Sequence, residues 1–280
     1  MKSIELADEL RVQLVQWRQA GLKIAFIPTM GNLHEGHLSL VDKGKQLADK
    51  VIVSIFVNPT QFVKGEDYES YPRTLPEDRK KLEALDVDIL FNPQVHEIYP
   101  GDIKRQTEVV VPYLDNIFCG KSRPGHFTGV ATVVTKLLNI VQPDYAIFGE
   151  KDYQQLLVIR QLVRDLRMAV EIVSIPTCRE ANGLAMSSRN AYLSEKEKLT
   201  AATLYQVLNE MAEAIRKGSS NYRQLEKTGL KNLTNVGFIP DYLSIVDAET
   251  LGSPGEGDLV ILAAARLGGA RLIDNIIIRR

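Results

Sequence analysis

Ile24-Ala25-Phe26-Ile27 is followed directly by Pro28-Thr29-Met30-Gly31-Asn32-Leu33-His34-Glu35-Gly36-His37, and then by a helix-like stretch at 38–48. The short apolar run predicts a buried strand, so the polar segment lies where a strand passes into a helix. Open α/β sheets bind their ligands at such junctions. Because the first N–H groups of a helix have no partner within it and lie at the positive end of its dipole, this segment is suited to an anion.

Two glycines and two histidines give this segment the chemistry of a phosphate site. Gly31 and Gly36 have no Cβ and let a phosphate approach the backbone. His34 and His37 are spaced i, i+3, which predicts that they lie on one helix face and donate hydrogen bonds to a polyphosphate. A surface accident or a pair of metal ligands would also fit this pattern, although the zinc-protease motif H-E-x-x-H has a wider spacing.

The composition narrows the class of protein. The chain has 280 residues, enough for two ordinary domains or one large one, and 45% are hydrophobic, enough for a packed core. No apolar stretch approaches the ~20 residues of a membrane span, and residues 2–8 are amphipathic and acidic, unlike a targeting segment. Cys119 and Cys178 are far apart and indicate neither a disulfide framework nor a metal cluster, which favours a reducing, cytoplasmic location. The formal net charge of −1 argues against a nucleic-acid partner.

Strand and helix patterns alternate in the first two-thirds of the chain. Strands are predicted at 24–27, 51–57, 87–91, 109–111, 145–148 and 170–175. Helices are predicted at 3–20, 38–48, 74–85, 130–141 and 153–166, the third opened by a capping box from Thr74 to Glu77. Strands separated by helices of this length predict βαβ units, and so an α/β fold with a doubly wound, Rossmann-like parallel sheet.

The pattern changes after Pro176. Asn182-Gly183 indicates a turn, and Ser194 to Glu197 is a second capping box, opening a long helix to 217. A helix at 221–235 and strands at 242–246, 259–265 and 272–278 follow, the last two joined by a hairpin turn at Gly268-Gly269. We therefore expect a nucleotide-binding domain at 1–180 and a smaller α+β domain at 181–280.

Two further polar segments follow predicted strands. Asn58 and Gln61 carry neutral amides that suit the hydroxyls and carboxylate of a small substrate, although an ordinary Asx-Pro loop would look the same. In Gly149-Glu150-Lys151-Asp152, the glycine gives access, the lysine is a point charge for phosphate, and the aspartate suits Mg²⁺ or a ribose hydroxyl. The alternative for this segment is a solvated helix start, where acidic residues are common.

Two more segments carry charged or hydroxyl side chains. Met186-Ser187-Ser188-Arg189-Asn190 combines two hydroxyls with a guanidinium, which can clamp a pyrophosphate and close as a lid, unless it is only a Ser-rich linker before Ser194. Arg123-Pro124-Gly125-His126-Phe127 is expected to line the acid-binding side or the triphosphate path, or to be a basic surface loop. His96 has no such setting and is expected to be exposed.

These segments together resemble one enzyme family. His34-Glu35-Gly36-His37 resembles the His-x-Gly-His signature of the nucleotidyltransferase superfamily, and the longer string from Pro28 to His37 resembles the pantoate–β-alanine ligases. The other segments that are similar to motifs of that family, in family order, are Phe56-Val57-Asn58-Pro59-Thr60-Gln61-Phe62, Arg123-Pro124-Gly125-His126-Phe127, Phe148-Gly149-Glu150-Lys151-Asp152, Met186-Ser187-Ser188-Arg189 and Arg271-Leu272-Ile273-Asp274-Asn275. The resemblance covers essentially the whole chain.

The resemblance implies an ATP-dependent ligase that joins pantoate to β-alanine through a pantoyl adenylate, with AMP and pyrophosphate as products. The catalytic residues that it implies are His34, His37, Lys151 and Arg189. The implied ATP-binding residues are Met30, Gly31, His34, His37, Gly149, Glu150, Lys151, Asp152, Cys178, Met186, Ser187, Ser188 and Arg189. The implied pantoate and β-alanine residues are Asn58, Gln61, Arg123, His126 and Gln155. Mg²⁺ is expected with ATP, held largely by phosphate oxygens and water, with Asp152 as the candidate protein ligand.

Two other classes stay open at this point. A nucleotidyltransferase that moves AMP or CMP onto a phosphate-bearing acceptor would form a stable nucleotide-diphosphate product and would not need Gln61. A non-catalytic ATP-binding regulator would leave the phosphate clamp incomplete, yet both histidines, Lys151 and Arg189 are present. A tRNA-charging enzyme is disfavoured by the length, the neutral charge and the lack of an anticodon-binding module. A homodimer is the family expectation and is also the commonest oligomer.

Overall fold

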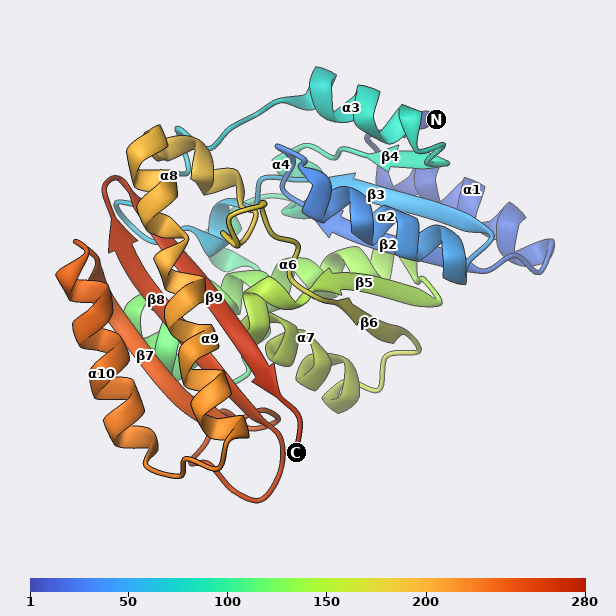
Figure 1. Ribbon diagram of the computed structural model, residues 1–280. Helices are drawn as coiled ribbons and strands as arrows, with labels where there is room; N and C mark the ends of the chain where they lie inside the picture. Colours follow the sequence, from blue (N-terminus) through green and yellow to red (C-terminus); the bar gives the residue numbers. More distant parts are fainter. The chain divides into compact units, whose positions relative to one another are not determined.

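The computed structural model describes residues 1–280, which form two compact units (Figure 1). The first unit comprises Met1–Glu150 and Gln154–Pro176, and the second comprises Lys151–Tyr153 and Thr177–Arg280. The chain thus changes unit at Pro176, whereas the sequence placed the domain boundary at 180. Residues 151–153 belong to the second unit although they follow a strand of the first.

The first unit contains a six-stranded sheet in which every strand pair is parallel, with the order β1-β4-β3-β2-β5-β6. The strands are β1 (Lys2–Ile4), β2 (Ile24–Thr29), β3 (Lys50–Ile55), β4 (Ile89–Phe91), β5 (Tyr145–Gly149) and β6 (Glu171–Ile175). The first four residues of β2 are fully buried, as expected for a central strand that is covered on both faces. Since the strands are parallel, their carboxyl ends lie along one edge of the sheet.

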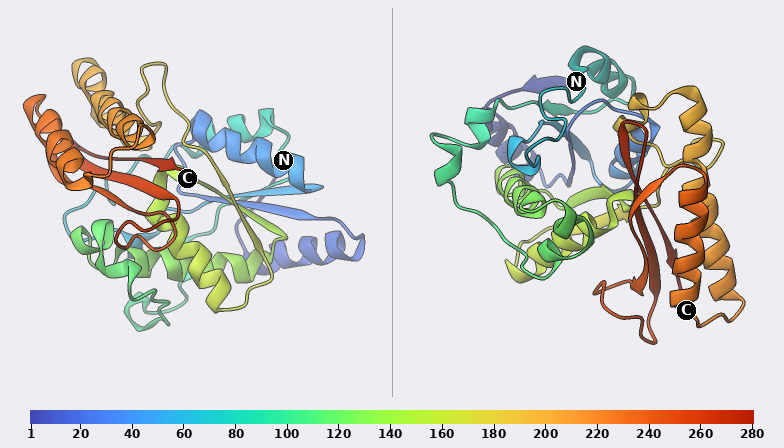
Figure 2. Two further views of the ribbon diagram at one scale, coloured as in Figure 1. Left: turned by 60° about the horizontal axis from the view of Figure 1, so that its bottom comes forward. Right: turned by 90° about the vertical axis from the view of Figure 1, so that its left-hand side faces the viewer.

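Helices cover both faces of this sheet. The helices of the first unit are α1 (Ala7–Gln19), α2 (Glu35–Leu47), α3 (Leu75–Ala84), α4 (Val95–Ile98), α5 (Phe118–Ser122), α6 (His126–Val141) and α7 (Tyr153–Asp165). Figure 2 shows α2 and α3 on one face and α1, α6 and α7 on the other. From β2 the chain winds toward β3, and from β5 it winds toward β6, in the opposite direction. The adjacent strands β2 and β5 therefore form the topological switch point, where such sheets bind ligands.

Three local predictions for this unit are wrong. No strand forms at 109–111, because the N–H of Val109 donates to Oγ1 of Thr132 on α6 (2.9 Å) and Pro112 has no N–H for a ladder. Strand β1 was missed, since its three residues are too few to show a period. Thr74 precedes α3 but forms no capping box, because its hydroxyl donates to Oδ2 of Asp78 (3.1 Å) instead.

The second unit is a smaller α+β structure, so the predicted fold class is confirmed. Its antiparallel sheet has the order β7-β8-β9, and α9 and α10 cover one face (Figure 1). Its elements are the 3₁₀ helix η5 (Ser188–Tyr192), α8 (Glu195–Ala201), α9 (Thr203–Arg216), α10 (Tyr222–Asn235), β7 (Ile239–Asp247), β8 (Leu259–Leu267) and β9 (Ala270–Ile278). The Ser194 capping box is confirmed, and so is the hairpin, in which Leu267 pairs with Ala270 across Gly268-Gly269. The long helix predicted to 217 is instead divided at Ala202.

Each unit has an apolar core of its own. In the first unit, side chains of α2, such as Val41, pack against Ile27 of β2 and Val53 of β3. In the second, Leu208 and Met211 of α9 pack against the sheet residue Ile261. None of the helices combines the length and the apolar composition that crossing a membrane requires.

Candidate functional site

The turn between β2 and α2 is closed by its own two histidines. His34 is the N-cap residue of α2, with φ −132°, and its Nδ1 accepts the N–H of Gly36 (3.2 Å). Nδ1 of His37 accepts the N–H of His34 (3.3 Å), and the two ring centroids are 4.1 Å apart. His34 precedes the helix as its N-cap and only His37 lies in it, but the two rings lie side by side, as the i, i+3 spacing predicted.

This reciprocal cap assigns the tautomer of both rings. A ring nitrogen that accepts a backbone N–H carries no proton, so in the neutral imidazole the proton is on Nε2. Each ring is held at Nδ1 and carries its N–H donor on the opposite side. An N–H at Nε2 of each ring is what the phosphate role expected from the sequence requires.

Asp78 of α3 holds the main chain of the same turn. Its carboxylate is fully buried and accepts the N–H of Asn32 (2.8 Å) and of Leu33 (2.7 Å). Gly31 has φ +81°, and a Cβ there would lie 3.1 Å from Oδ2 of Asp78, so this position requires glycine. Sequence analysis missed Asp78, because an acidic residue in the first turn of a helix is ordinary and its partners are distant in sequence.

The segment after β3 meets this turn through Gln61. The half-buried Gln61 donates from Nε2 to Sδ of Met30 (3.2 Å), and its Oε1 accepts from Nδ2 of Asn58 (3.0 Å). Asn58 is only 1% exposed, and its Oδ1 accepts the hydroxyl of Tyr99 (2.8 Å). Burial raises the pKa of Tyr99, which keeps this hydroxyl protonated as a donor. The burial of Asn58 argues against the direct substrate contact expected from the sequence.

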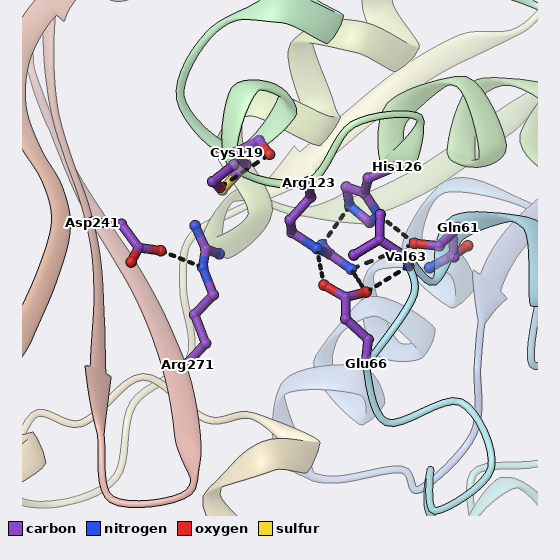
Figure 3. Close-up of polar contacts among 9 residues, drawn as sticks. Gln61, Val63, Glu66, Cys119, Arg123, His126, Asp241 and Arg271 are labelled. Carbon is purple, nitrogen blue, oxygen red and sulfur yellow. Dashed lines mark hydrogen bonds and ion pairs between the residues drawn. The ribbon is translucent and has the colours of Figure 1, made fainter.

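Arg123 and His126 belong to a partly buried network around Gln61 (Figure 3). Nε and Nη2 of Arg123 bind the two carboxylate oxygens of Glu66 (2.5 and 2.7 Å), and Nη1 binds Nε2 of His126 (2.8 Å). Nδ1 of His126 contacts the main-chain oxygen of Gln61 (2.7 Å). Burial would raise the pKa of Glu66, but the hydrogen bonds and charge of Arg123 outweigh it, and the pKa lies below its ordinary value.

The alternative of a basic surface loop at 123–127 is wrong. The side chains of Arg123 and Glu66 are 15% and 22% exposed, and His126 is buried. Sequence analysis missed Glu66, since a single acidic residue in a loop carries no signal of its partner.

The segment after β5 contributes residues to both units. Glu150 accepts the hydroxyl of Ser174 on β6 (2.9 Å), in the first unit. On α7, Gln154 is buried and binds the main chain at Leu114 and Ile117 (2.8 and 2.9 Å), whereas Gln155 is half-buried. Of these two neighbours, Gln155 is the one whose side chain is accessible to a ligand.

In the second unit, Lys151 is held in place through its main-chain carbonyl. Its carbonyl accepts Nδ2 of Asn275 on β9 (3.0 Å), and its Nζ lies 3.7 Å from Oδ2 of Asp152. The side chain of Lys151 is 19% exposed, so the ammonium is partly shielded from water.

A hairpin at 178–186 supports the serine-rich loop of the second unit. The N–H of Met186 donates to the carbonyl of Cys178 (3.0 Å), and the predicted turn at Asn182-Gly183 is confirmed by φ +92° at Gly183. Arg179 on this hairpin forms a bidentate ion pair with Asp274 of β9 (2.7 and 2.8 Å) and stacks on the ring of Tyr205.

The loop at 187–190 is ordered by short-range and hairpin contacts. The Ser187 hydroxyl caps η5 by accepting the N–H of Arg189 (3.2 Å). The buried Asn190 donates to Oε1 of Glu180 (2.9 Å) and to the carbonyl of Ala185 (3.1 Å). Ser187, Ser188 and Arg189 are half-buried, which argues against the alternative that this segment is only a Ser-rich linker before Ser194.

The fold and these side chains together define a class of protein. The first unit is a doubly wound α/β structure whose polar segments follow the carboxyl ends of β2, β3 and β5, at and beside the switch point. The imidazole donors of His34 and His37, at a helix N-terminus, and the half-buried amide of Gln61 lie at this edge. This is the class of α/β enzymes that bind an anionic ligand at the carboxyl edge of the sheet.

Comparisons with known proteins agree with this class and narrow it. The family profile described as pantoate-beta-alanine ligase matches residues 2–277. The chain is 54% identical over 280 residues to the pantothenate synthetase of Methylococcus capsulatus, covering 99% of this chain and 98% of that one. It is 53% identical over 278 residues to that of Alkalilimnicola ehrlichii, covering 99% and 97%.

Solved structures give the same result. The pantothenate synthetase of Thermus thermophilus superposes with a TM-score of 0.90 at 46% identity, covering 99% of each chain. The pantoate-beta-alanine ligase of Francisella tularensis, solved with beta-gamma ATP and beta-alanine, superposes with a TM-score of 0.82 at 37% identity, covering 99% of this chain and 97% of that one.

The chain belongs to the pantoate–β-alanine ligase family. It is an enzyme of pantothenate biosynthesis, which condenses pantoate with β-alanine. A nucleotidyltransferase for phosphate-bearing acceptors and a non-catalytic regulator are thereby set aside.

Proposed function

We propose that this ligase activates pantoate with ATP, forming a pantoyl adenylate and pyrophosphate, before the amine of β-alanine attacks. The observation that carries the proposal is the reciprocal histidine cap at the switch point, which holds two N–H donors beside a helix N-terminus. A carboxylate is too stable to react with an amine, so it must first acquire a better leaving group. The Francisella relative, whose structure contains beta-gamma ATP and beta-alanine, supports ATP as the activating substrate.

In this proposal, catalysis is positioning and charge stabilisation. The pantoate carboxylate attacks the α-phosphorus in line, and pyrophosphate leaves; the β-alanine amine then attacks the acyl carbon, and AMP leaves. Neither step requires a covalent bond to the protein. His34 and His37 hold the phosphates through Nε2–H, and His37 is the candidate hydrogen-bond donor that stabilises the departing pyrophosphate.

The remaining nucleotide contacts come from the segments on either side of the unit boundary. Lys151 neutralises charge at the α-phosphate, and Ser187, Ser188 and Arg189 receive the pyrophosphate. Support for these roles comes from the partly shielded Lys151 ammonium and from the ordered, half-buried loop at 187–189. The other proposed ATP contacts are Met30, Gly31, Gly149, Glu150, Asp152, Cys178 and Met186.

Gln61 and Gln155 are the proposed contacts of pantoate. Both are half-buried amides, a suitable setting for the hydroxyls of a small polar acid. We assign Asn58 a supporting role, because it is buried and binds Oε1 of Gln61. We propose that the first domain binds pantoate and most of the nucleotide, and that the second domain, which adds further ATP contacts, acts as a lid or a dimer-associated module.

We also propose Mg²⁺ as the companion of ATP. No group of three or more His, Cys, Asp or Glu side chains is arranged to hold a metal ion. The proposed ion is therefore one that phosphate oxygens and water hold for the most part, with the carboxylate of Asp152 as one contributing ligand. Bound in this way, Mg²⁺ would neutralise phosphate charge.

Two properties of the whole protein are proposed from the family alone. A homodimer is the expected oligomer, and two cysteines that form no disulfide are compatible with a cytoplasmic location. Sedimentation of the purified protein would test the first.

A product assay tests the proposed reaction. The enzyme is supplied with ATP, pantoate and β-alanine, and the adenine products are separated. We expect AMP and pyrophosphate in amounts equal to the pantothenate formed. ADP and orthophosphate would contradict adenylation and would indicate an acyl phosphate instead.

A further inference from the structure

The main chain at Gln61 is held by a chain of three side chains that do not lie next to it in sequence. Glu66 binds Arg123 through two oxygens, Arg123 binds His126, and His126 binds the Gln61 carbonyl (Figure 3). Oε2 of Glu66 also accepts the N–H of Val63 (3.1 Å), so the carboxylate joins Arg123 to the same loop. The network is therefore closed around residues 61–66.

The donors and acceptors of this network fix the state of His126. A guanidinium can only donate, so Nε2 of His126, 2.8 Å from Nη1 of Arg123, must be the acceptor. Nδ1 then carries the proton and donates to the Gln61 carbonyl (2.7 Å). The ring is thus a neutral Nδ1–H imidazole, the opposite tautomer to that of His34 and His37.

Close packing makes the position of Gln61 sensitive to this network. A Cβ on Gly129 of α6 would lie 2.3 Å from the carbonyl oxygen of Thr60 and 2.7 Å from the Gln61 nitrogen, so the helix touches the main chain of this segment directly. Asn58 and Met30 hold the Gln61 amide itself. A shift of the Gln61 carbonyl would therefore move the amide away from both.

We infer that Glu66, Arg123 and His126 are positioning residues, which set the affinity for pantoate by fixing Gln61 and do not bind the substrate themselves. The inference rests on the proposed role of Gln61 in pantoate binding. Arg123 uses Nε, Nη1 and Nη2 within the network, and His126 uses both ring nitrogens, so every nitrogen of the two side chains already binds a protein group. This revises the direct pantoate or β-alanine contact that the resemblance implied for Arg123 and His126.

Two variants of His126 separate a positioning role from simple packing. In His126→Asn, the side-chain amide can take the place of Nδ1–H and donate to the Gln61 carbonyl. In His126→Gln, the side chain reaches toward Arg123 and loses the bond to Gln61. We expect KM for pantoate to rise about tenfold in His126→Gln and about threefold or less in His126→Asn, with KM for ATP nearly unchanged in both. Equal rises of both KM values, or the same pantoate KM in the two variants, would overturn the inference.

The Glu66–Arg123 ion pair provides a second, independent test with a control variant. Glu66→Gln removes the charge that holds Arg123 and should raise KM for pantoate, whereas Glu66→Asp should restore part of the affinity. The control is Asp88→Asn, which breaks the partly buried Lys50–Asp88 pair at the opposite, amino-terminal end of the strands. A rise in pantoate KM in Asp88→Asn as large as that in Glu66→Gln would also count against the inference.

A double-variant cycle distinguishes the inference from the proposal beneath it. If the network acts through Gln61, His126→Gln should add little to the pantoate KM of Gln61→Ala. If Gln61→Ala alone leaves that KM unchanged, the proposed role of Gln61 fails. If Gln61→Ala raises it and His126→Gln does not, the role of Gln61 stands and the positioning network fails.

Discussion

Asp78 and Asp274 are both buried carboxylates that order a segment of the candidate site, but they bind different groups. Asp78, in the first unit, accepts two main-chain N–H groups of the turn after β2. Asp274, in the second unit, binds the guanidinium of Arg179 and so holds a hairpin through a side chain. Its neighbour Asn275 binds the carbonyl of Lys151.

The difference separates two ways of building a site. A carboxylate that accepts backbone N–H groups fixes the main chain itself, which suits a turn that is proposed to bind an anion through its main chain and its capping rings. A buried ion pair fixes a scaffold and leaves the loop after the hairpin, residues 187–190, to be ordered by contacts between residues that are closer in sequence. The energetic consequences also differ, because loss of Asp274 leaves a cation unpaired, whereas loss of Asp78 leaves neutral donors unpaired.

The largest expected effect is therefore on stability, in Asp274→Ala. The Asp274 and Arg179 side chains are 2% and 17% exposed, and breaking such a buried pair costs about 3–5 kcal/mol. Urea unfolding, followed with a probe in the second unit, measures the change. Glu213→Ala, which removes an exposed pair with Arg216, is the control and should change stability by less than about 1 kcal/mol. Similar losses of stability in Asp274→Ala and Glu213→Ala would show that the buried ion pair contributes no more than an exposed one.

The next effect is on catalysis, in Lys151→Ala. We expect kcat to fall about 10²–10³-fold while the protein stays folded, because the variant removes the charge that is proposed to stabilise the transition state. Steady-state kinetics and the thermal midpoint measure the two quantities. Lys80→Ala, on the exposed side of α3, is the matched control and should keep full activity. Normal turnover of Lys151→Ala would exclude this lysine from the site.

A smaller effect is expected in Asp78→Asn. The amide keeps one acceptor oxygen but replaces the other with a donor, so at least one N–H of the turn is left unpaired, which costs about 1–3 kcal/mol. Since this turn carries His34, KM for ATP should also rise, while KM for pantoate changes less. The control is Asp42→Asn, an exposed carboxylate on α2. An unchanged KM for ATP would show that Asp78 supports the fold without shaping the nucleotide site.

Sequence analysis predicted the elements that carry a local signal. The apolar runs at β2, β3 and β5 and the capping box at Ser194 depend on neighbouring residues, and the structure contains each of them. The same signal failed at Thr74, because Asp78 competes for its hydroxyl. The strand predicted at 109–111 failed for a similar reason, since a side chain on α6 satisfies its backbone.

The buried or partly buried carboxylates that hold the site residues in place could not be predicted, because their partners are distant in sequence. Asp78 binds a turn 45 and 46 residues away, and Glu66 binds Arg123 57 residues away. A single acidic residue has no spacing pattern that would indicate such partners. The motifs identified the residues for which ligand roles are proposed, and the structure adds the residues that hold them in place.

The measurement that tests the central claim most directly is exchange of labelled pyrophosphate into ATP. Adenylation is a complete and reversible reaction of its own. The amine of β-alanine takes part only after the pantoyl adenylate has formed. We predict exchange when pantoate is present and β-alanine is absent, no exchange without pantoate, and loss of exchange in Lys151→Ala. Exchange that strictly requires β-alanine would contradict the two-step account and favour a concerted reaction.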